Sequence, residues 1–295
     1  MAALIEGLVV AHLGQGIAVE HADKIILCQT RRRLETVAVG DKVLWTQSSP
    51  DQGCIEEILP RRSLLARPSR NGKTRPVAAN IDTVFVVFAV EPFCDFLLID
   101  QYLAVCENRD IDAALVLNKT DLLQSDSIEK ELLDYQKLGY PLYRVSAASA
   151  TGLDELKRAL KDQVSIFAGQ SGVGKSSLTN ALIPDKELKT NTISATTKHG
   201  RHTTTATTLY HLNDGGDLLD SPGVAIFGLA GLTGQQLAYG YREFQHLLDH
   251  CQFNDCRHDQ DKGCAVRSAA ESGEISMTRY QRFLKLREKM SVAYD

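Results

Sequence analysis

A glycine-rich segment in the middle of the chain has the residue types of a phosphate-binding loop. It reads GQSGVGKSS and fits the pattern G-x-x-x-x-G-K-[ST] through Gly169, Gly174, Lys175 and Ser176. Glycines let backbone N–H groups surround phosphates, the lysine neutralises the β- and γ-phosphates, and the hydroxyl holds Mg²⁺. The residues expected to contact a nucleotide here are Gly169, Gln170, Ser171, Gly172, Val173, Gly174, Lys175, Ser176 and Ser177.

A phosphate loop does not choose a base, but the motif NKTD at residues 118–121 does. Guanine presents N1–H and 2-amino donors that the carboxylate of Asp121 can accept, whereas adenine has an acceptor at N1. We expect Asn118 to hydrogen-bond the guanine edge and the stem of Lys119 to lie against the ring. Such a site rejects the wrong base because its buried polar groups would stay unpaired. Four letters alone also fit an ordinary polar loop.

A second loop adds to the expected base contacts. The segment VSAAS at residues 145–149 weakly matches the Ser-Ala loop that supports guanine in GTPases. It contributes Ser146 and Ala147, and Thr120 joins them from within NKTD. Because both loops follow predicted strands, they should lie at the same edge of a sheet.

Two segments, TTKHGRHTTT from residue 196 and DSPG from Asp220, have the composition of nucleotide-sensitive switches. Asp220 should act on Mg²⁺, through water, and the N–H of Gly223 should contact the γ-phosphate. A hydroxyl-rich, glycine-containing loop can close on Mg²⁺ when that phosphate is present. Thr204 is the expected Mg²⁺ ligand, with Thr205 as the alternative.

Val224 follows DSPG, where Ras-like enzymes carry a glutamine that orients the attacking water. A valine cannot orient water, so intrinsic hydrolysis should be slow and should depend on another group. His202 is hypothesised to be a catalytic residue in addition to Lys175, because an imidazole can accept a water proton near neutral pH. A solvent-exposed histidine without this role is an equally good interpretation.

The segment CQFNDCRHDQDKGC has the donor set of a metal site. Its spacing is C-x₄-C-x-H-x₅-C, which provides three thiolates and one imidazole for tetrahedral Zn²⁺ and leaves no open position for catalysis. We therefore expect a structural ion held by Cys251, Cys256, His258 and Cys264. His250 is a weaker alternative ligand, and three reduced cysteines packed without metal are the other alternative.

The elements that must position these residues fall into three units. A chain of 295 residues predicts two or three domains. The first 60 residues contain short β-prone runs without a helix, which favours an OB-fold barrel, with an SH3-like barrel as the alternative. The runs cover residues 7–13, 16–20, 24–30, 35–47 and 54–59.

From residue 81 apolar strands alternate with helical segments, which is typical of an α/β sheet with crossover helices. The expected strands are residues 82–90, 113–118, 143–147 and 164–169, and the expected helices are residues 98–110, 127–139, 153–162 and 175–182. Residues 207–220 should form a hairpin that turns at residues 213–216. All three nucleotide motifs then follow the carboxyl ends of strands, where such sheets bind ligands.

Charge is unevenly distributed along the chain. Residues 1–75 contain 11 Lys and Arg against 8 Asp and Glu, so their net charge is +3, while the remaining residues carry −7 of the total of −4. The segment 61–75 has six basic residues and no acid. A flexible, solvated linker is the favoured interpretation, and a phosphate-contacting strip is the alternative.

Residues 276–290 predict an amphipathic helix that packs on a core through one face. The apolar positions at helical spacing are Met277, Tyr280, Phe283, Leu284 and Met290. The expected exterior is mostly basic and comprises Arg279, Arg282, Lys285, Arg287 and Lys289. A solvated face is the default, and contact with RNA is the alternative.

Composition predicts a folded cytoplasmic protein. No apolar run approaches the roughly 18 residues of a membrane helix, and the N-terminus lacks the pattern of a signal peptide. The seven cysteines are an odd number, and four of them are widely scattered. This argues against a disulfide framework.

The order of the motifs, with NKTD before the phosphate loop, resembles the circularly permuted RsgA (YjeQ/YloQ) family of GTPases. GRHTTT, DSPG and the Cys-Cys-His-Cys segment followed by GCAV and ISMTRY support the resemblance, as do GDKVLW, RRSLLARP and AANID nearer the N-terminus. It covers essentially the whole chain. One departure is HDQDKGC in place of the usual H-x-x-E-P-G-C, which removes no ligand.

The resemblance implies a multidomain fold with an OB-fold RNA-binding domain (1–70), a circularly permuted GTPase domain (71–230) and a mainly α zinc-binding domain (231–295). It implies a bacterial factor that binds the immature 30S subunit late in assembly and hydrolyses GTP to GDP and phosphate. Hydrolysis would be stimulated by the subunit and linked to release. The outer domains would contact 16S rRNA, Mg²⁺ would accompany GTP, and a monomer without a membrane partner is expected.

Two rival functions belong to other classes. One is a metal-handling GTPase whose zinc is cargo, which a closed set of four ligands argues against. The other is a nucleotide-sensing scaffold without stimulated hydrolysis. The permuted order also suggests that movement of the switch half passes straight into the C-terminal domain, because DSPG runs directly into it.

Overall fold

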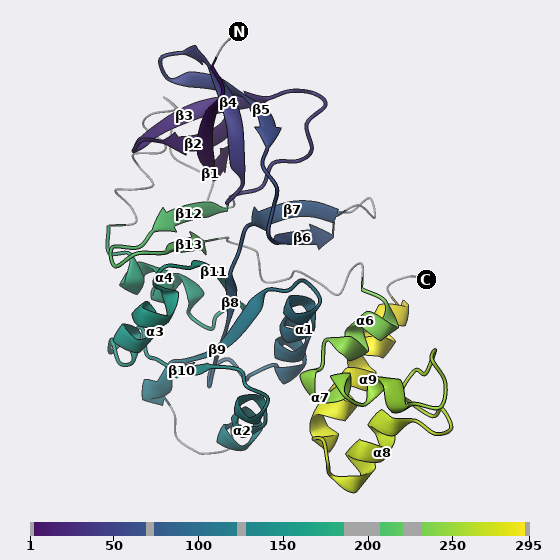
Figure 1. Ribbon diagram of the computed structural model, residues 1–295. Helices are drawn as coiled ribbons and strands as arrows, with labels where there is room; N and C mark the ends of the chain where they lie inside the picture. Colours follow the sequence, from purple (N-terminus) through teal and green to yellow (C-terminus); the bar gives the residue numbers. More distant parts are fainter. Residues whose placement is uncertain (1–2, 69–73, 123–127, 186–206, 221–231, 293–295) are drawn as a thin grey trace.

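Three regions follow one another in the computed structural model, which describes residues 3–68, 74–122, 128–185, 207–220 and 232–292 (Figure 1). They are an N-terminal barrel, a central α/β domain and a helical C-terminal domain. None of the helices in these ranges is long and apolar enough to span a bilayer.

The barrel closes through five strands. Its order is β1-β2-β3-β5-β4, with β4 pairing back on β1 and with β3 and β5 running parallel. The strands are β1 (Ile5–Leu13), β2 (Gly16–His21), β3 (Lys24–Thr30), β4 (Lys42–Ser49) and β5 (Gln52–Ile58). Val9, Val43, Trp45 and Ile55 are almost fully buried inside it. The five-stranded OB-like barrel predicted from the sequence is therefore confirmed.

The predicted strand over residues 35–47 is wrong in its first half, because β4 begins only at Lys42. Gly40 has a φ of 90° and lies so close to the carbonyl of Ala79 that a side chain would clash there. The buried carboxylate of Asp41 accepts a hydrogen bond from the N–H of Ala38 at 2.7 Å. This turn takes the chain out of the barrel ladder and against the segment that leaves the barrel.

The favoured interpretation of residues 61–75 as a flexible linker is also wrong for the described part of that segment, residues 61–68 and 74–75. Strands β6 (Leu64–Pro68) and β7 (Thr74–Ala79) pair as a two-stranded antiparallel sheet. Arg61 donates to both carboxylate oxygens of Asp41, at 2.7 and 2.8 Å, so its charge is already paired inside the protein. Arg62 pairs with Asp82. The basic residues at the start of this segment therefore join the barrel to the central domain.

The central sheet confirms the predicted α/β pattern. Its order is β10-β9-β8-β11-β13-β12, and all its strands except β12 are parallel. The strands are β8 (Thr83–Ala89), β9 (Asp112–Asn118), β10 (Leu142–Arg144), β11 (Val164–Ala168), β12 (Thr208–His211) and β13 (Asp217–Asp220). Every residue of β8 is buried, as expected of a strand covered on both faces. The predicted hairpin is β12–β13.

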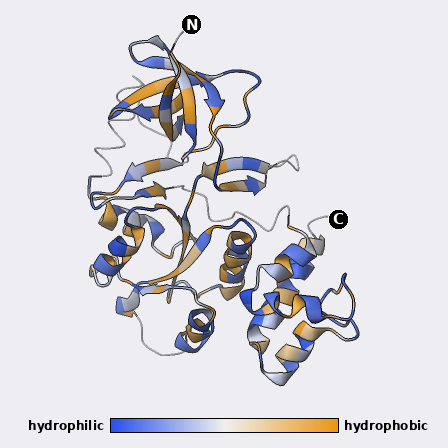
Figure 2. Cartoon of the chain, viewed as in Figure 1, coloured by the Kyte–Doolittle hydropathy of each residue, from blue (hydrophilic) through white to orange (hydrophobic). Residues whose placement is uncertain are grey.

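Helices cover both faces of this sheet. They are α1 (Phe96–Glu107), α2 (Glu129–Lys137), α3 (Leu153–Leu160) and α4 (Lys175–Leu182), with a short 3-10 helix, η1 (Thr120–Leu122), after β9. Alternate residues of β8 enter different cores: Val86 packs on the side of α1 and α2, whereas Val87 packs on the side of α3 and α4. Figure 2 shows both hydrophilic and hydrophobic residues on these helices, as expected of helices with one packed face.

The C-terminal domain packs on the α1 face. It contains α6 (Gly234–Tyr239), α7 (Arg242–Gln245), the 3-10 helix η2 (Leu248–His250), α8 (Ala265–Ser272) and α9 (Met277–Val292). Helix α1 contacts both α6 and α9, and one continuous apolar cluster runs through both domains. A capping box of Thr233 and Gln236 begins α6.

The predicted basic exterior of α9 needs correction. Only 1% of Arg279 and 8% of Arg282 is exposed, because their guanidinium groups pair with Asp100 on α1. Met277, expected on the packed face, is 39% exposed. Charge type alone did not reveal these positions, since the acid that draws both arginines inward belongs to another domain.

Candidate nucleotide and metal sites

The phosphate loop lies between β11, which ends at Ala168, and α4, which begins at Lys175. Gly169, Gly172 and Gly174 have φ angles of 142°, 82° and 92°, a region that side chains disfavour. A Cβ atom at Gly169 would meet the carbonyl of Val87. The glycine spacing predicted from the sequence is therefore required by the backbone.

Lys175 lies over its own loop. Its Nζ donates to the carbonyl oxygens of Gly169 at 2.8 Å and Gln170 at 2.7 Å. Burial lowers the pKa of this lysine, and the charge of Asp220 partly opposes that shift. The lysine is therefore held at the centre of the loop, where it can neutralise phosphate charge.

Asn118 has a role that sequence reasoning missed. Its amide Nδ2 donates to the carbonyl of Val173 in the phosphate loop at 2.9 Å, and its Oδ1 accepts from the N–H of Ala147 at 3.2 Å. Only 1% of the residue is exposed, and a Cβ at Gly174 would strike it. Asn118 therefore ties the phosphate loop to the Ser-Ala loop.

The remaining base-loop residues lie together as predicted. The hydroxyl of Ser146 donates to Oδ1 of Asp121 at 2.5 Å, and the N–H of Ser149 donates to Ser146 at 3.1 Å. Thr120 donates to the carbonyl of Val145 through its N–H and its hydroxyl. These bonds orient the carboxylate that is expected to read guanine.

The loop between β8 and α1 also borders this site, and no sequence motif pointed to it. Lys119 has a φ of 60°, and its Nζ donates to the carbonyl of Glu91 at 2.8 Å. Pro92 faces Gly172, and Phe93 is 86% exposed. The available signal was the position of this loop at the carboxyl end of β8, the same edge that holds the other loops.

Two of the predicted Mg²⁺ ligands lie in the described residues. Ser176 is in the first turn of α4, and Asp220 ends β13. Because β13 pairs in parallel with β11, the end of β13 is next to the strand that leads into the phosphate loop. The other switch positions, which lie outside the described residues, are His202, Thr204, Thr205, Gly223 and Val224.

The predicted metal ligands converge in the C-terminal domain. One ligand atom from each of Cys251, Cys256, His258 and Cys264 lies within 4.8 Å of the others, and it is the only such group found in the described residues. Nδ1 of His258 is 3.5 Å from Sγ of Cys251 and 3.7 Å from Sγ of Cys264. Three thiols and one imidazole fit a tetrahedral ion such as zinc.

Neighbouring groups hold these ligands in place. The N–H of Arg267 donates to Sγ of Cys264 at 3.3 Å, and Tyr280 donates to the carbonyl of His258 at 2.8 Å. Burial raises the pKa of the Cys256 thiol to about 12, a cost that a bound cation would offset. The weaker alternative ligand, His250, bonds instead to the carbonyl of His246.

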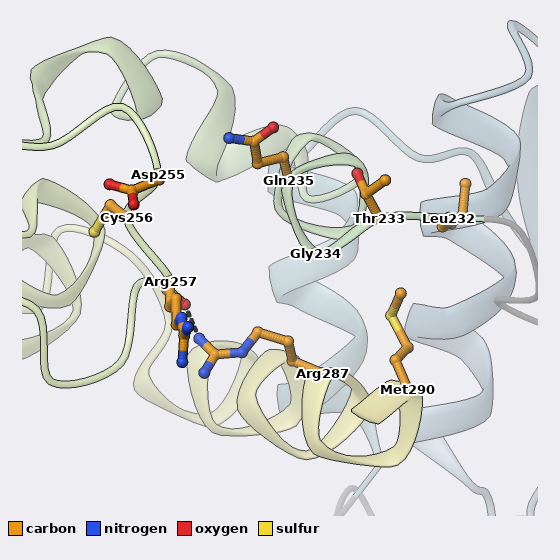
Figure 3. A pocket seen from close by; sticks show the side chains of 9 residues that line it. All are labelled: Leu232, Thr233, Gly234, Gln235, Asp255, Cys256, Arg257, Arg287 and Met290. Carbon is orange, nitrogen blue, oxygen red and sulfur yellow. Dashed lines mark hydrogen bonds between the residues drawn. The ribbon is translucent and has the colours of Figure 1, made fainter. Parts of the chain in front are cut away.

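A cavity of about 520 Å³ lies beside the metal ligands, away from the phosphate loop (Figure 3). Its lining comprises Leu232, Thr233, Gly234, Gln235, Asp255, Cys256, Arg257, Arg287 and Met290. Arg287 donates to the carbonyl of Arg257 across one side of it. The cavity shares Cys256 with the metal group and no residue with the nucleotide loops.

Comparison with known proteins gives consistent relatives. A family model described as RsgA GTPase matches residues 58–230. A protein of Hahella chejuensis named small ribosomal subunit biogenesis GTPase RsgA is 43% identical over 293 residues, covering 97% of this chain and 84% of the relative. A protein of the same name from Klebsiella pneumoniae is 42% identical over 297 residues, with the same coverages.

Two solved structures share the architecture. The crystal structure of YjeQ from Thermotoga maritima matches with a TM-score of 0.76 and 32% identity, covering 97% of this chain and 98% of that one. The structure of YloQ, described as a circularly permuted GTPase, matches with a TM-score of 0.76 and 29% identity, covering 99% and 96%. The likeness therefore extends over all three regions.

Proposed function

The chain belongs to the RsgA family of GTPases, and from that premise we propose that it binds the small ribosomal subunit late in assembly and hydrolyses GTP under the control of that subunit. Nucleotide binding is supported by the pair of hydrogen bonds made by Asn118, here called the Asn118 brace. It joins the phosphate loop at Val173 to the Ser-Ala loop at Ala147. A single rigid site can thus recognise phosphates and guanine together.

Several described residues of the site have a proposed task. Asp121, oriented by Ser146, accepts the two donors of the guanine edge. The N–H groups of residues 169–174 and the ammonium of Lys175 surround the phosphates. Ser176 and Asp220 would hold Mg²⁺, which when bound neutralises charge on the β- and γ-phosphate oxygens.

We also propose that His202 activates the attacking water and that Thr204 completes the Mg²⁺ site. Val224 offers no group to orient water, which is why a second residue is needed. Replacing His202 by Ala should lower turnover in the subunit-stimulated reaction by at least one order of magnitude. An unchanged stimulated rate would remove His202 from the mechanism.

The outer domains are proposed to contact 16S rRNA, from opposite ends of one monomer. The basic N-terminal segment and the OB-like barrel suit a nucleic acid. The proposed units remain 1–70, 71–230 and 231–295, with the hairpin β6–β7 spanning the first boundary. Zn²⁺ on Cys251, Cys256, His258 and Cys264 would be structural, since four protein ligands leave no open position.

The decisive experiment measures GTP turnover of the purified chain alone and with 30S subunits, free RNA or Zn²⁺. We expect only the subunits to raise the rate strongly. Stimulation by zinc would favour a metal-handling GTPase, and GTP binding without any stimulated hydrolysis would favour a scaffold. Cosedimentation with 30S subunits in a GTP analogue but not in GDP is the expected signature of release linked to hydrolysis.

A further inference from the structure

The barrel touches the central sheet at the β12–β13 hairpin. Ala11 of β1 pairs with Thr208 of β12, which makes the barrel and the central sheet one continuous 11-stranded sheet. At the other end of β12, His211 lies opposite Asp217 of β13 in the ladder. The hairpin is therefore shared by two domains.

His211 forms an ion-pair triad with acids from both sides of this contact. Its Nδ1 is 2.6 Å from Oδ1 of Asp217, and its Nε2 is 2.6 Å from Oε2 of Glu20 in barrel strand β2. Hydrogen bonds, first to Asp217 and then to Glu20, raise the pKa of His211 to about 10. Both ring nitrogens can therefore donate at neutral pH.

The hairpin also adjoins the nucleotide machinery. Strand β12 begins four residues after Thr204, the proposed switch threonine, and β13 ends at Asp220, the proposed Mg²⁺ residue. Asp217 is three residues from Asp220 on the same short strand. His211, which links Glu20 of the barrel to Asp217, thus lies close in the chain to the residues proposed to respond to the γ-phosphate.

We propose that His211 is a positioning residue that couples the barrel to the GTP site, so that a small subunit bound by the barrel stimulates hydrolysis through the β12–β13 hairpin. This inference rests on the proposed function, because it requires the barrel to engage the subunit. His211 does not touch the substrate; it sets the orientation of the barrel relative to Asp217 and therefore to the strand that ends at Asp220.

Electrostatics make the triad sensitive to one side chain. The imidazolium separates two carboxylates, so its removal both loses two charge-assisted bonds and leaves like charges facing each other. An arginine would keep a planar cation between them, whereas alanine or glutamine would not. Because 51% of the His211 side chain is exposed, its loss should cost little folding stability.

The test compares basal and subunit-stimulated GTP turnover for the full chain and three variants, H211A, H211R and the double variant H211A/E20Q. We expect basal rates within about twofold of one another, and stimulated kcat about fivefold lower in H211A. H211R should restore most of the stimulation, and the double variant should restore part of it, because it removes the repulsion. E57Q, a change at an exposed barrel acid outside the triad, should behave as the unmodified chain.

Two further measurements separate coupling from loss of structure. Thermal unfolding should show H211A folded, and its decrease in stimulation should be larger at low than at high salt. The distribution of distances between labels, introduced by non-canonical amino acids at Lys24 and Asp154, should be broader in H211A than in the unmodified chain. In H211R it should be narrow again.

The outcomes distinguish this inference from the proposed function. If the unmodified chain is not stimulated by 30S subunits, the proposed function fails. If it is stimulated and H211A is stimulated equally, the coupling through His211 is wrong. If H211R is as poorly stimulated as H211A although both are folded, the role assigned to the positive charge is wrong.

Discussion

The central domain contacts the barrel and the C-terminal domain through charged side chains that differ in burial. The C-terminal domain is attached through buried charges: the side chains of Arg279 and Asp100 are 2% and 0% exposed. The barrel meets the β12–β13 hairpin through the Ala11–Thr208 pairing and through His211, whose side chain is 51% exposed while those of Glu20 and Asp217 are 22% and 23% exposed. Buried charge pairs tolerate little movement, whereas a partly exposed ion pair opens and closes at a smaller cost.

The buried junction is a network. Arg279 also pairs with Glu243 of α7, and its guanidinium lies between the rings of Tyr135 and Tyr241, 4.7 and 4.9 Å from their centres. Arg282 bridges Asp100 and Glu131. These contacts fix α9 on α1 and α2, which belong to the half of the central domain that contains NKTD.

This difference changes the expectation drawn from the permuted order. Chain continuity suggested that the switch half moves the C-terminal domain, because DSPG leads directly into it. The buried network instead favours a C-terminal domain held to the half that contains NKTD, while the partly exposed His211 contact lies on the hairpin between the two proposed switch motifs. The barrel is then the domain better placed to respond to the γ-phosphate.

Removal of the proposed zinc should cause the largest loss of stability among these predictions. The loss should be confined to the C-terminal domain. C256S, or a chelator that strips the ion, should lower the stability of the loop between Cys251 and Cys264 by roughly 5 kcal/mol or more. Hydrogen exchange of α8 is the measurement, with the barrel strands as an internal control. Equal protection with and without metal would contradict a structural ion.

Breaking the buried network should come next. R279A leaves Asp100 and Glu243 buried without their partner, so the free energy of unfolding should fall by about 3–5 kcal/mol. Urea unfolding measures it, and K285A, an exposed change on the same helix, should stay within about 0.5 kcal/mol of the unmodified chain. If the two variants lowered the free energy of unfolding by similar amounts, the buried pairs of Arg279 would contribute no more to stability than an exposed side chain does.

The nucleotide site between the junctions should show an intermediate effect. N118A leaves the carbonyl of Val173 and the N–H of Ala147 without the brace, which should weaken GTP binding by about 2 kcal/mol, or roughly 30-fold. Fluorescent-nucleotide titration measures the affinity. Binding unchanged within about twofold would show that the two loops hold their positions without Asn118.

The smallest effect should be a pH-dependent loosening of the barrel junction. The folded-state pKa of His211, about 10, lies above the ordinary histidine pKa of 6.5, so the stabilisation is fully present below pH 6.5 and is lost as the pH rises through about 10. The distribution of label distances between the barrel and the central domain should therefore broaden between pH 8 and 11. The distribution measured across the Arg279 network should not change over this range. In H211R the barrel distances should not change over this range, because arginine keeps its charge.

Local pattern was enough to predict much of the site. The phosphate loop, the base motif and the metal ligands depend on residue types at short spacing, and the hairpin β12–β13 turned where expected. Asn118 shows the limit, because its partners Val173 and Ala147 are 55 and 29 residues away. A motif identifies a residue type, but it does not say which loops that residue will hold together.

The sequence by itself determined the chemistry of this protein: which residues can surround phosphate, read guanine and hold a metal, and that these motifs occur in permuted order. Only the tertiary structure decided which charges are buried. Arg279 leaves solvent because Asp100, 179 residues earlier, is brought beside it, and His211 meets Glu20 across 191 residues. Burial and pairing of a charge depend on neighbours from distant segments, which short-range pattern does not specify.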